Sequence, residues 1–151
     1  MAQPLFTIGY EQATPAAVLA ELVGARVDLL ADVRAVTASR RPGFSKRQLA
    51  ASLDESGISY LHLRPLGTPP EGRAAARCGQ FEELRRIFGA HMRTPPARDA
   101  LDELTMLVRS GKRVCLLCYE RDHTHCHRSQ VAQMVSEQVR TKTENLIPRL
   151  Y

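Results

Sequence analysis

The sequence has few aromatic residues and no long apolar segment. Only 5% of its residues are Phe, Trp or Tyr, so few side chains are available to stack on the bases of single-stranded nucleic acid. No apolar run approaches the ~20 residues that a membrane-spanning helix needs. The first residues, MAQPLFTIGY, lack the basic start, apolar stretch and small-residue cleavage site of a secretory signal. We therefore expect a cytoplasmic protein with no membrane partner.

Internal repeats, linkers and low-complexity segments are also missing. A chain of 151 residues that is 44% hydrophobic and 25% charged has the size and composition of one soluble domain, which we expect to span residues 1–151. Its four cysteines are expected to be free thiols, because the cytoplasm is reducing. The net charge of +5 is not gathered into a basic tail, but it favours an anionic partner such as a phosphate ester, nucleotide or nucleic acid.

Apolar runs and helical patterns alternate along the chain. Residues 5–9, 28–33, 58–63 and 113–118 predict four buried strands, and a fifth short strand is expected around residues 146–147. Between them lie five helical patterns, which are expected to begin near Thr14, Ser45, Phe81, Thr94 and Thr124. Ser45 and Gln48 have the spacing of a capping box. Residues 64–79, rich in Gly, Pro and Arg, predict a long loop. This alternation predicts a three-layer, Rossmann-like α/β domain, with a mainly parallel sheet of about five strands and helices on both faces.

Unusual polar residues follow each of the four predicted strands. Because ligands of open parallel sheets bind at the carboxyl ends of the strands, these residues are expected to share one rim. The candidate ligand-binding residues lie at the end of each predicted strand or after it: Tyr10 for the first strand, Asp32, Arg34, Ser39 and Arg40 for the second, Gly67 for the third, and Cys118, Arg121 and Arg128 for the fourth.

Three segments together resemble a known family. DVRAVTASRRPGFSK, LHLRPLGTP and CYERDHTHCHRS are similar to the signatures of the bacterial family catalogued as domain of unknown function 488. The resemblance runs from TIGY through the last predicted helix, and it implies an α/β fold and a site in these segments, without a defined reaction. Tyr10 stands where many members have histidine, and His123 stands where proline often follows the aspartate. A mechanism that requires a base at position 10 is therefore not expected here.

The cysteines and histidines of residues 118–130 raise the question of a metal site. Cys115 and Cys118 are three residues apart on one strand, where their side chains point to opposite faces. A zinc or iron site made of Cys118, Cys126 and the histidines at 125 and 127 is an alternative. It lacks the second half of the usual paired zinc pattern, and neighbours such as Cys126 and His127 would diverge on a helix. No metal or other cofactor is predicted as the first choice.

Proton transfer and nucleophilic chemistry have three candidates. Cys126 would lie in the first turn of a helix starting near Thr124, where the helix dipole and Arg128 favour a thiolate. Glu120 and His127 are candidates for proton transfer. The C-x5-R pattern of cysteine phosphatases is absent. The alternative is that Cys126 only packs between strand and helix.

Anion binding at the same place needs fewer assumptions. The N–H groups of a helix start, together with Arg34, Arg40 and Arg128, would form a binding site of the size of a phosphate group. The alternative is that these arginines form ion pairs within the protein, with Asp32 and other carboxylates, and only fix the loops. Two function classes remain open: an enzyme acting on a nucleotide, nucleic-acid end or phosphorylated small molecule, and a non-catalytic nucleic-acid-binding module. The scarcity of aromatic residues favours the first.

Overall fold

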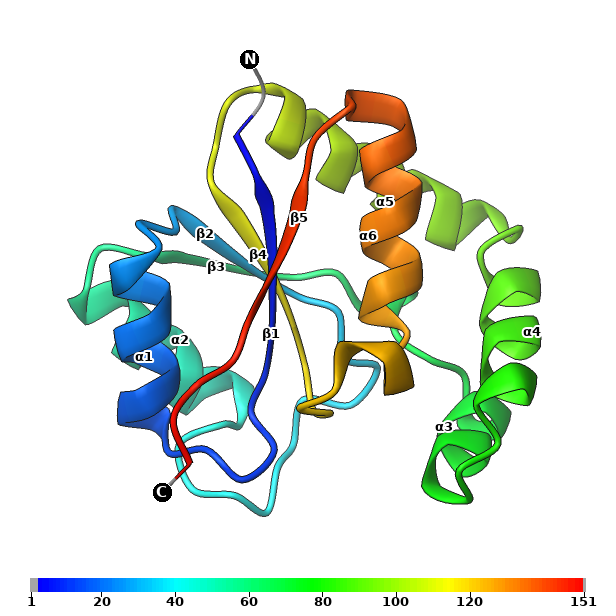
Figure 1. Ribbon diagram of the computed structural model, residues 1–151, viewed down its shortest axis with the longest axis horizontal. Helices are drawn as coiled ribbons and strands as arrows, with labels where there is room; N and C mark the ends of the chain where they lie inside the picture. Colours follow the sequence, from blue (N-terminus) through cyan, green and yellow to red (C-terminus); the bar gives the residue numbers. More distant parts are fainter. Residues whose placement is uncertain (1–2, 151) are drawn as a thin grey trace.

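The computed structural model describes residues 3–150 and contains one five-stranded sheet in which every pair of neighbouring strands is parallel (Figure 1). The strands are β1 (Leu5–Gly9), β2 (Leu29–Asp32), β3 (Ser59–His62), β4 (Val114–Cys118) and β5 (Thr143–Leu146). Their order across the sheet is β3-β2-β4-β1-β5. All residues of β1, β2 and β4 are buried, as expected for central strands covered on both faces. The predicted parallel sheet of about five strands is confirmed.

Helices cover both faces of this sheet. One face packs on α1 (Pro15–Gly24) and α2 (Lys46–Glu55), and the other on α5 (Pro95–Arg109) and α6 (Arg128–Val139) (Figure 1). Each interface holds its own apolar cluster. Cys115 belongs to the cluster under α1 and α2, whereas Cys118 belongs to the cluster under α5 and α6. The three-layer α/β architecture and the prediction that these two cysteines point to opposite faces are both confirmed.

Residues 64–79 do not form the predicted loop. They contain the 3-10 turn η1 (Arg64–Leu66) and the helix α3 (Pro70–Arg77), which packs against α4 (Phe81–His91). Pro70 lies at the first helical position, where no intrahelical N–H is needed, and the three alanines at 74–76 are strong helix formers. Gly72 faces Leu84 and Ile87 of α4. The glycine that indicated a loop is therefore a close-packing residue of a helix pair.

Two predicted helix starts differ from the structure in detail. Ser45 is the N-cap of α2 but makes no capping hydrogen bond; its Oγ accepts from the Ser39 N–H at 3.0 Å. Gln48 Oε1 accepts from the N–H of Gly43 at 3.1 Å. The predicted capping box is wrong, because both side chains bind the preceding loop instead.

The helix predicted near Thr124 begins later, at Arg128. Asp122 Oδ1 accepts from the Thr124 N–H at 2.9 Å and opens a short 3-10 turn, η2 (His123–His125). Cys126 then has an extended backbone, with φ −132 and ψ 146. Cys126 therefore lies outside the first turn of α6, and the helix-dipole argument for its thiolate does not apply.

Within residues 3–150, none of the helices combines the length and the hydropathy that a membrane-spanning helix requires.

Candidate active site

A cavity of about 510 Å³ lies at the carboxyl ends of β1, β2 and β4. The chain leaves β1 toward α1 on one face and leaves the neighbouring β4 toward α6 on the other (Figure 1). Such a divergence of connections is where open α/β sheets bind their ligands. The walls are formed by residues 10–11 after β1, 34–36 after β2, Cys118 at the end of β4 with residues 119–120, 122 and 125–127 after it, and Thr68 with one side of α3 and α4.

The turns after β1 and β4 are fixed against each other. A Cβ added at Gly9 would overlap the carbonyl oxygen of Glu120, so only glycine permits this approach. The Glu11 N–H donates to the Tyr119 carbonyl at 2.9 Å, and Glu11 Oε1 accepts from the Arg121 N–H at 3.0 Å. These contacts hold one wall of the cavity in place.

Arg34 forms an internal ion pair with Asp32. Their side chains are 5% and 0% exposed, and Arg34 donates to both carboxylate oxygens, from Nε to Oδ1 at 2.9 Å and from Nη2 to Oδ2 at 2.7 Å. Nη1 donates to Tyr10 Oη at 3.2 Å and to the Phe44 carbonyl at 2.7 Å. Burial alone would lower the pKa of Arg34, but the hydrogen bonds and charge of Asp32 raise it above its ordinary value. At most one guanidinium N–H remains for a ligand.

Tyr10 lines the cavity between Arg34 and two other rings. It stacks on Phe44 with ring centroids 4.4 Å apart and meets Tyr119 edge-on at 5.4 Å. Asp32 also accepts a short hydrogen bond from the hydroxyl of Tyr60, whose pKa is raised by burial and by this acceptor. Asp32 itself is fully buried and does not line the cavity.

The structure does not bring Arg34, Arg40 and Arg128 together around one anion. Arg40 is exposed and, like Ser39, does not line the cavity. Arg128 is 1% exposed and lies beneath the turn after β4, where it donates to the carbonyls of Glu120 at 2.5 Å and Arg121 at 3.3 Å. Burial lowers the pKa of Arg128 to about 10. This guanidinium holds the turn rather than facing the cavity.

Arg121 and Gly67 also lie outside the cavity walls. Arg121 Nη1 is buried without a hydrogen-bond partner among residues 3–150. A Cβ added at Gly67 would overlap the backbone of Ala35, so this glycine lets η1 approach the loop after β2. Its neighbour Thr68 does line the cavity.

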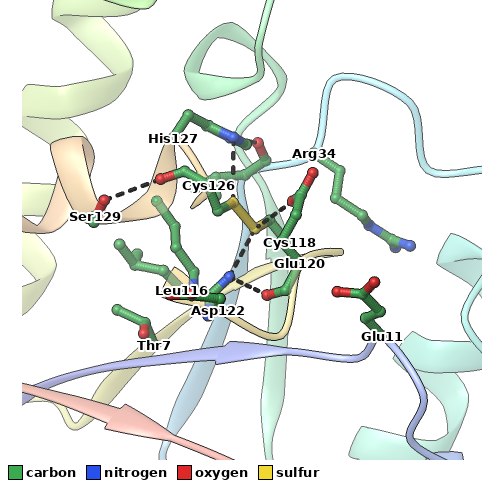
Figure 2. Close-up of a disulfide and its surroundings, with 12 residues drawn as sticks. Thr7, Glu11, Arg34, Leu116, Cys118, Glu120, Asp122, Cys126, His127 and Ser129 are labelled. Carbon is green, nitrogen blue, oxygen red and sulfur yellow. Dashed lines mark hydrogen bonds between the residues drawn. A yellow bond between two sulfur atoms is a disulfide. The ribbon is translucent and has the colours of Figure 1, made fainter. Parts of the chain in front are cut away.

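Cys118 and Cys126 are joined by a disulfide at the cavity wall (Figure 2). The prediction of four free thiols is wrong for this pair, because the turn after β4 brings Cys126 back against the strand end. Cys78 and Cys115 are free. Arg128 Nη1 donates to Cys118 Sγ at 3.1 Å, and Glu120 Oε2 lies 3.5 Å from the same sulfur. Burial raises the pKa of Glu120.

His127 lies against the other sulfur. Its Nε2 is 2.7 Å from the carbonyl oxygen of Val33, which can only accept, so Nε2 carries the proton. Burial lowers the pKa of His127 to about 4, so the ring is neutral at pH 7 and Nδ1 has a free lone pair. Nδ1 lies 3.6 Å from Cys126 Sγ (Figure 2). Cys126, His127 and Glu120, the predicted catalytic candidates, therefore share one wall of the cavity.

Two arginines that are not among the candidates from the sequence, Arg73 and Arg77, also line the cavity. Arg73 and Arg77 are four residues apart on α3, a spacing that puts both on one helix face. Arg73 Nη1 donates to the Thr68 carbonyl at 3.0 Å, while Arg77 is exposed. The R-A-A-A-R spacing indicates such a pair only if the segment is helical, and the sequence predicted a loop for residues 64–79. His125, a candidate ligand of the alternative metal site, stacks on Phe81 with ring centroids 4.0 Å apart.

A family model described as "Domain of unknown function DUF488" matches residues 14–135. Comparisons with curated proteins and with solved structures found no match. The matched range contains the loop after β2, the whole of α3 and the segment from Cys118 to Arg128, and it confirms the resemblance seen in the sequence. The chain belongs to the DUF488 family.

Proposed function

We propose that the cavity binds a small anionic ligand, such as a phosphate ester or nucleotide, through Arg73 and Arg77. The observation that carries this proposal is the position of these two arginines on one face of α3, where both line the cavity. Guanidinium groups bind phosphate oxygens in a bidentate manner. Arg34, held by Asp32, adds at most one further hydrogen bond.

The charge of the cavity favours a small ligand over a nucleic-acid strand. Three acidic residues, Glu11, Glu120 and Asp122, line it beside its three arginines. A continuous phosphate backbone would be repelled by these carboxylates, whereas a single phosphate can approach the α3 side alone. The second function class, a nucleic-acid-binding module, is therefore the less favoured one.

The same cavity supports an enzyme rather than a passive binding module. Cys126, His127 and Glu120 line the wall formed by the segment after β4, so an anion held by α3 would lie in the same enclosure as an imidazole nitrogen and a carboxyl group. Reduction of the Cys118–Cys126 disulfide would add a thiol. Such a set can act as nucleophile and proton acceptor or donor.

Calorimetric titration with orthophosphate, pyrophosphate and AMP tests the proposal. The double variant Arg73→Gln/Arg77→Gln is expected to weaken binding by at least tenfold, because each hydrogen bond to a charged group contributes about 1.5–3 kcal/mol. Arg47→Gln, an exposed arginine of α2 outside the cavity, is the matched control and is expected to bind like the unchanged protein. Equal affinity for the double variant, or no binding of any of the three probes, would contradict the proposal. Tight, steeply salt-dependent binding of oligonucleotides would support the alternative.

A further inference from the structure

Three potential metal ligands meet at one point of the cavity wall. The sulfur atoms of Cys118 and Cys126 and a ring nitrogen of His127 all lie within 4.8 Å of one another, and all three residues are buried. Thiolate and imidazole are the ligands that zinc prefers in proteins. We propose that these three residues bind a divalent transition-metal ion, Zn²⁺ in the first place, when the disulfide is reduced. The site does not depend on the anion binding proposed above.

The orientation of His127 is that of a metal-binding histidine. Its Nε2–H donates to the Val33 carbonyl at 2.7 Å, and its Nδ1 lone pair faces Cys126 Sγ. Histidines that bind metals nearly always donate their second ring N–H to a carbonyl or carboxylate, which fixes the ring and its tautomer. The N–H donated by Arg128 to Cys118 Sγ at 3.1 Å is a second outer contact of the same kind, because it stabilises negative charge on sulfur.

The backbone also suits a metal. Neighbouring side chains such as those of Cys126 and His127 would diverge on a helix, but Cys126 is extended and α6 starts only at Arg128. The Cα atoms of Cys118 and Cys126 are 7.4 Å apart, which is beyond the 4.4–6.8 Å that most disulfides span. Two thiolates on one tetrahedral zinc ion are about 3.8 Å apart, given Zn–S bonds of about 2.3 Å, so a metal-bound pair needs the wider spacing.

The disulfide and the metal exclude each other. A dithiol reductant transfers two electrons and two protons to the Cys118–Cys126 bond and leaves as its own disulfide, so each protein sulfur becomes a thiol. The metal ion then displaces the two thiol protons to solvent, because only thiolates bind it. The two thiolate charges cancel the charge of the ion, and the charges of Arg128 and Glu120 cancel each other. The loaded site would therefore be close to neutral.

Three protein ligands leave the fourth tetrahedral position open. Structural zinc sites are closed by four protein ligands, whereas catalytic ones keep a position for water or substrate. Glu120, whose Oε2 is 3.5 Å from Cys118 Sγ, is near enough to bind the ion or a water on it. His125 is stacked on Phe81 and is not part of the ligand group.

Cobalt titration of the full-length protein tests the site. The reduced protein, freed of reductant without air, is expected to bind one Co²⁺ with the near-ultraviolet sulfur-to-cobalt absorption and the visible bands of tetrahedral Co²⁺, and Zn²⁺ is expected to abolish both. The oxidised protein should show neither. Cys126→Ser should lose the sulfur band or reduce its intensity, and His127→Gln should weaken binding by at least ~10-fold. Cys78→Ser, a free and exposed cysteine, is the matched control and should bind Co²⁺ like the unchanged protein.

The result that would overturn the site is a reduced, unchanged protein that shows no sulfur-to-cobalt absorption, or an equal loss in Cys78→Ser. If the cysteine variants fail to fold, X-ray absorption of the zinc-loaded unchanged protein decides the matter. Two sulfur and at least one nitrogen neighbour are expected, and a shell of oxygen alone would reject the site. Neither outcome bears on the calorimetric test of Arg73 and Arg77.

Discussion

Replacement of Arg34 by methionine is expected to destabilise the fold, because Arg34 is the charge partner of a fully buried carboxylate. In Arg34→Met, Asp32 keeps the hydrogen bond from Tyr60 and one from the backbone N–H of residue 34, but it loses two guanidinium hydrogen bonds and the compensating charge. Removal of one partner of a buried ion pair lowers the free energy of unfolding by about 3–5 kcal/mol. For a chain of this size that corresponds to a fall in Tm of roughly 10 °C.

Urea unfolding followed by circular dichroism measures this loss. The double variant Asp32→Asn/Arg34→Met removes the buried charge as well, so it should be more stable than Arg34→Met, by roughly 1–3 kcal/mol of coupling. Arg40→Met, an exposed arginine of the same loop, is the matched control and should stay within about 0.5 kcal/mol of the unchanged protein. A loss below about 1 kcal/mol for Arg34→Met would show that the Asp32–Arg34 ion pair does not stabilise the fold, and Arg34 would again be a candidate for ligand binding.

Three further outcomes are expected. Gly9→Ala should lower the free energy of unfolding by about 1–3 kcal/mol, because the added Cβ overlaps the turn after β4. Gly89→Ala, which has open space inside α4, should raise it by roughly 0.5–1 kcal/mol. A destabilised Gly89→Ala together with an unaffected Gly9→Ala would contradict the close contact between the turns after β1 and β4. Burial lowers the pKa of His127 in the folded protein from 6.5 to about 4, so on acidification the unfolded chain takes up this proton first. The contribution to the free energy of unfolding is complete above pH 6.5 and should fall by on the order of 3 kcal/mol toward pH 4. With a metal chelator present, His127→Gln should lose this part of the pH dependence, and an unchanged pH dependence in the variant would contradict the lowered pKa. In the native protein without reductant, a thiol reagent should modify the exposed Cys78 but not the buried Cys115, which should react only after unfolding. More than two reactive thiols in the unfolded, unreduced protein would contradict the disulfide.

The sequence predicted the layers of the fold because apolar runs carry a strong signal. Strands buried on both faces need continuous apolar residues, and the runs at 5–9, 28–33 and 113–118 have them. The rim at the carboxyl ends followed from the parallel arrangement alone. The helix α3 was missed because proline and glycine count against a helix, although Pro70 is tolerated in the first turn and Gly72 is buried in the contact with α4.

The sequence predicted the edge of the sheet at which the cavity lies, but not which side chains line it. Sequence spacing does not reveal which arginines are buried. Arg34 and Arg128 are buried and bind groups of the protein itself, whereas Arg73 and Arg77 line the cavity. The meeting of Cys118 with Cys126 depends on the path of residues 119–127. That path is set by long-range contacts such as the one between Glu11 and the N–H of Arg121, which no local pattern reports.

A crystal structure of the protein grown with phosphate or AMP would locate the bound anion and so tests whether the cavity is the binding site. We expect density between the guanidinium groups of Arg73 and Arg77, inside the cavity at the ends of β1, β2 and β4 and facing Cys126 and His127. An anion bound at the exposed loop that carries Arg40, or only at the amino ends of the strands, would contradict the account.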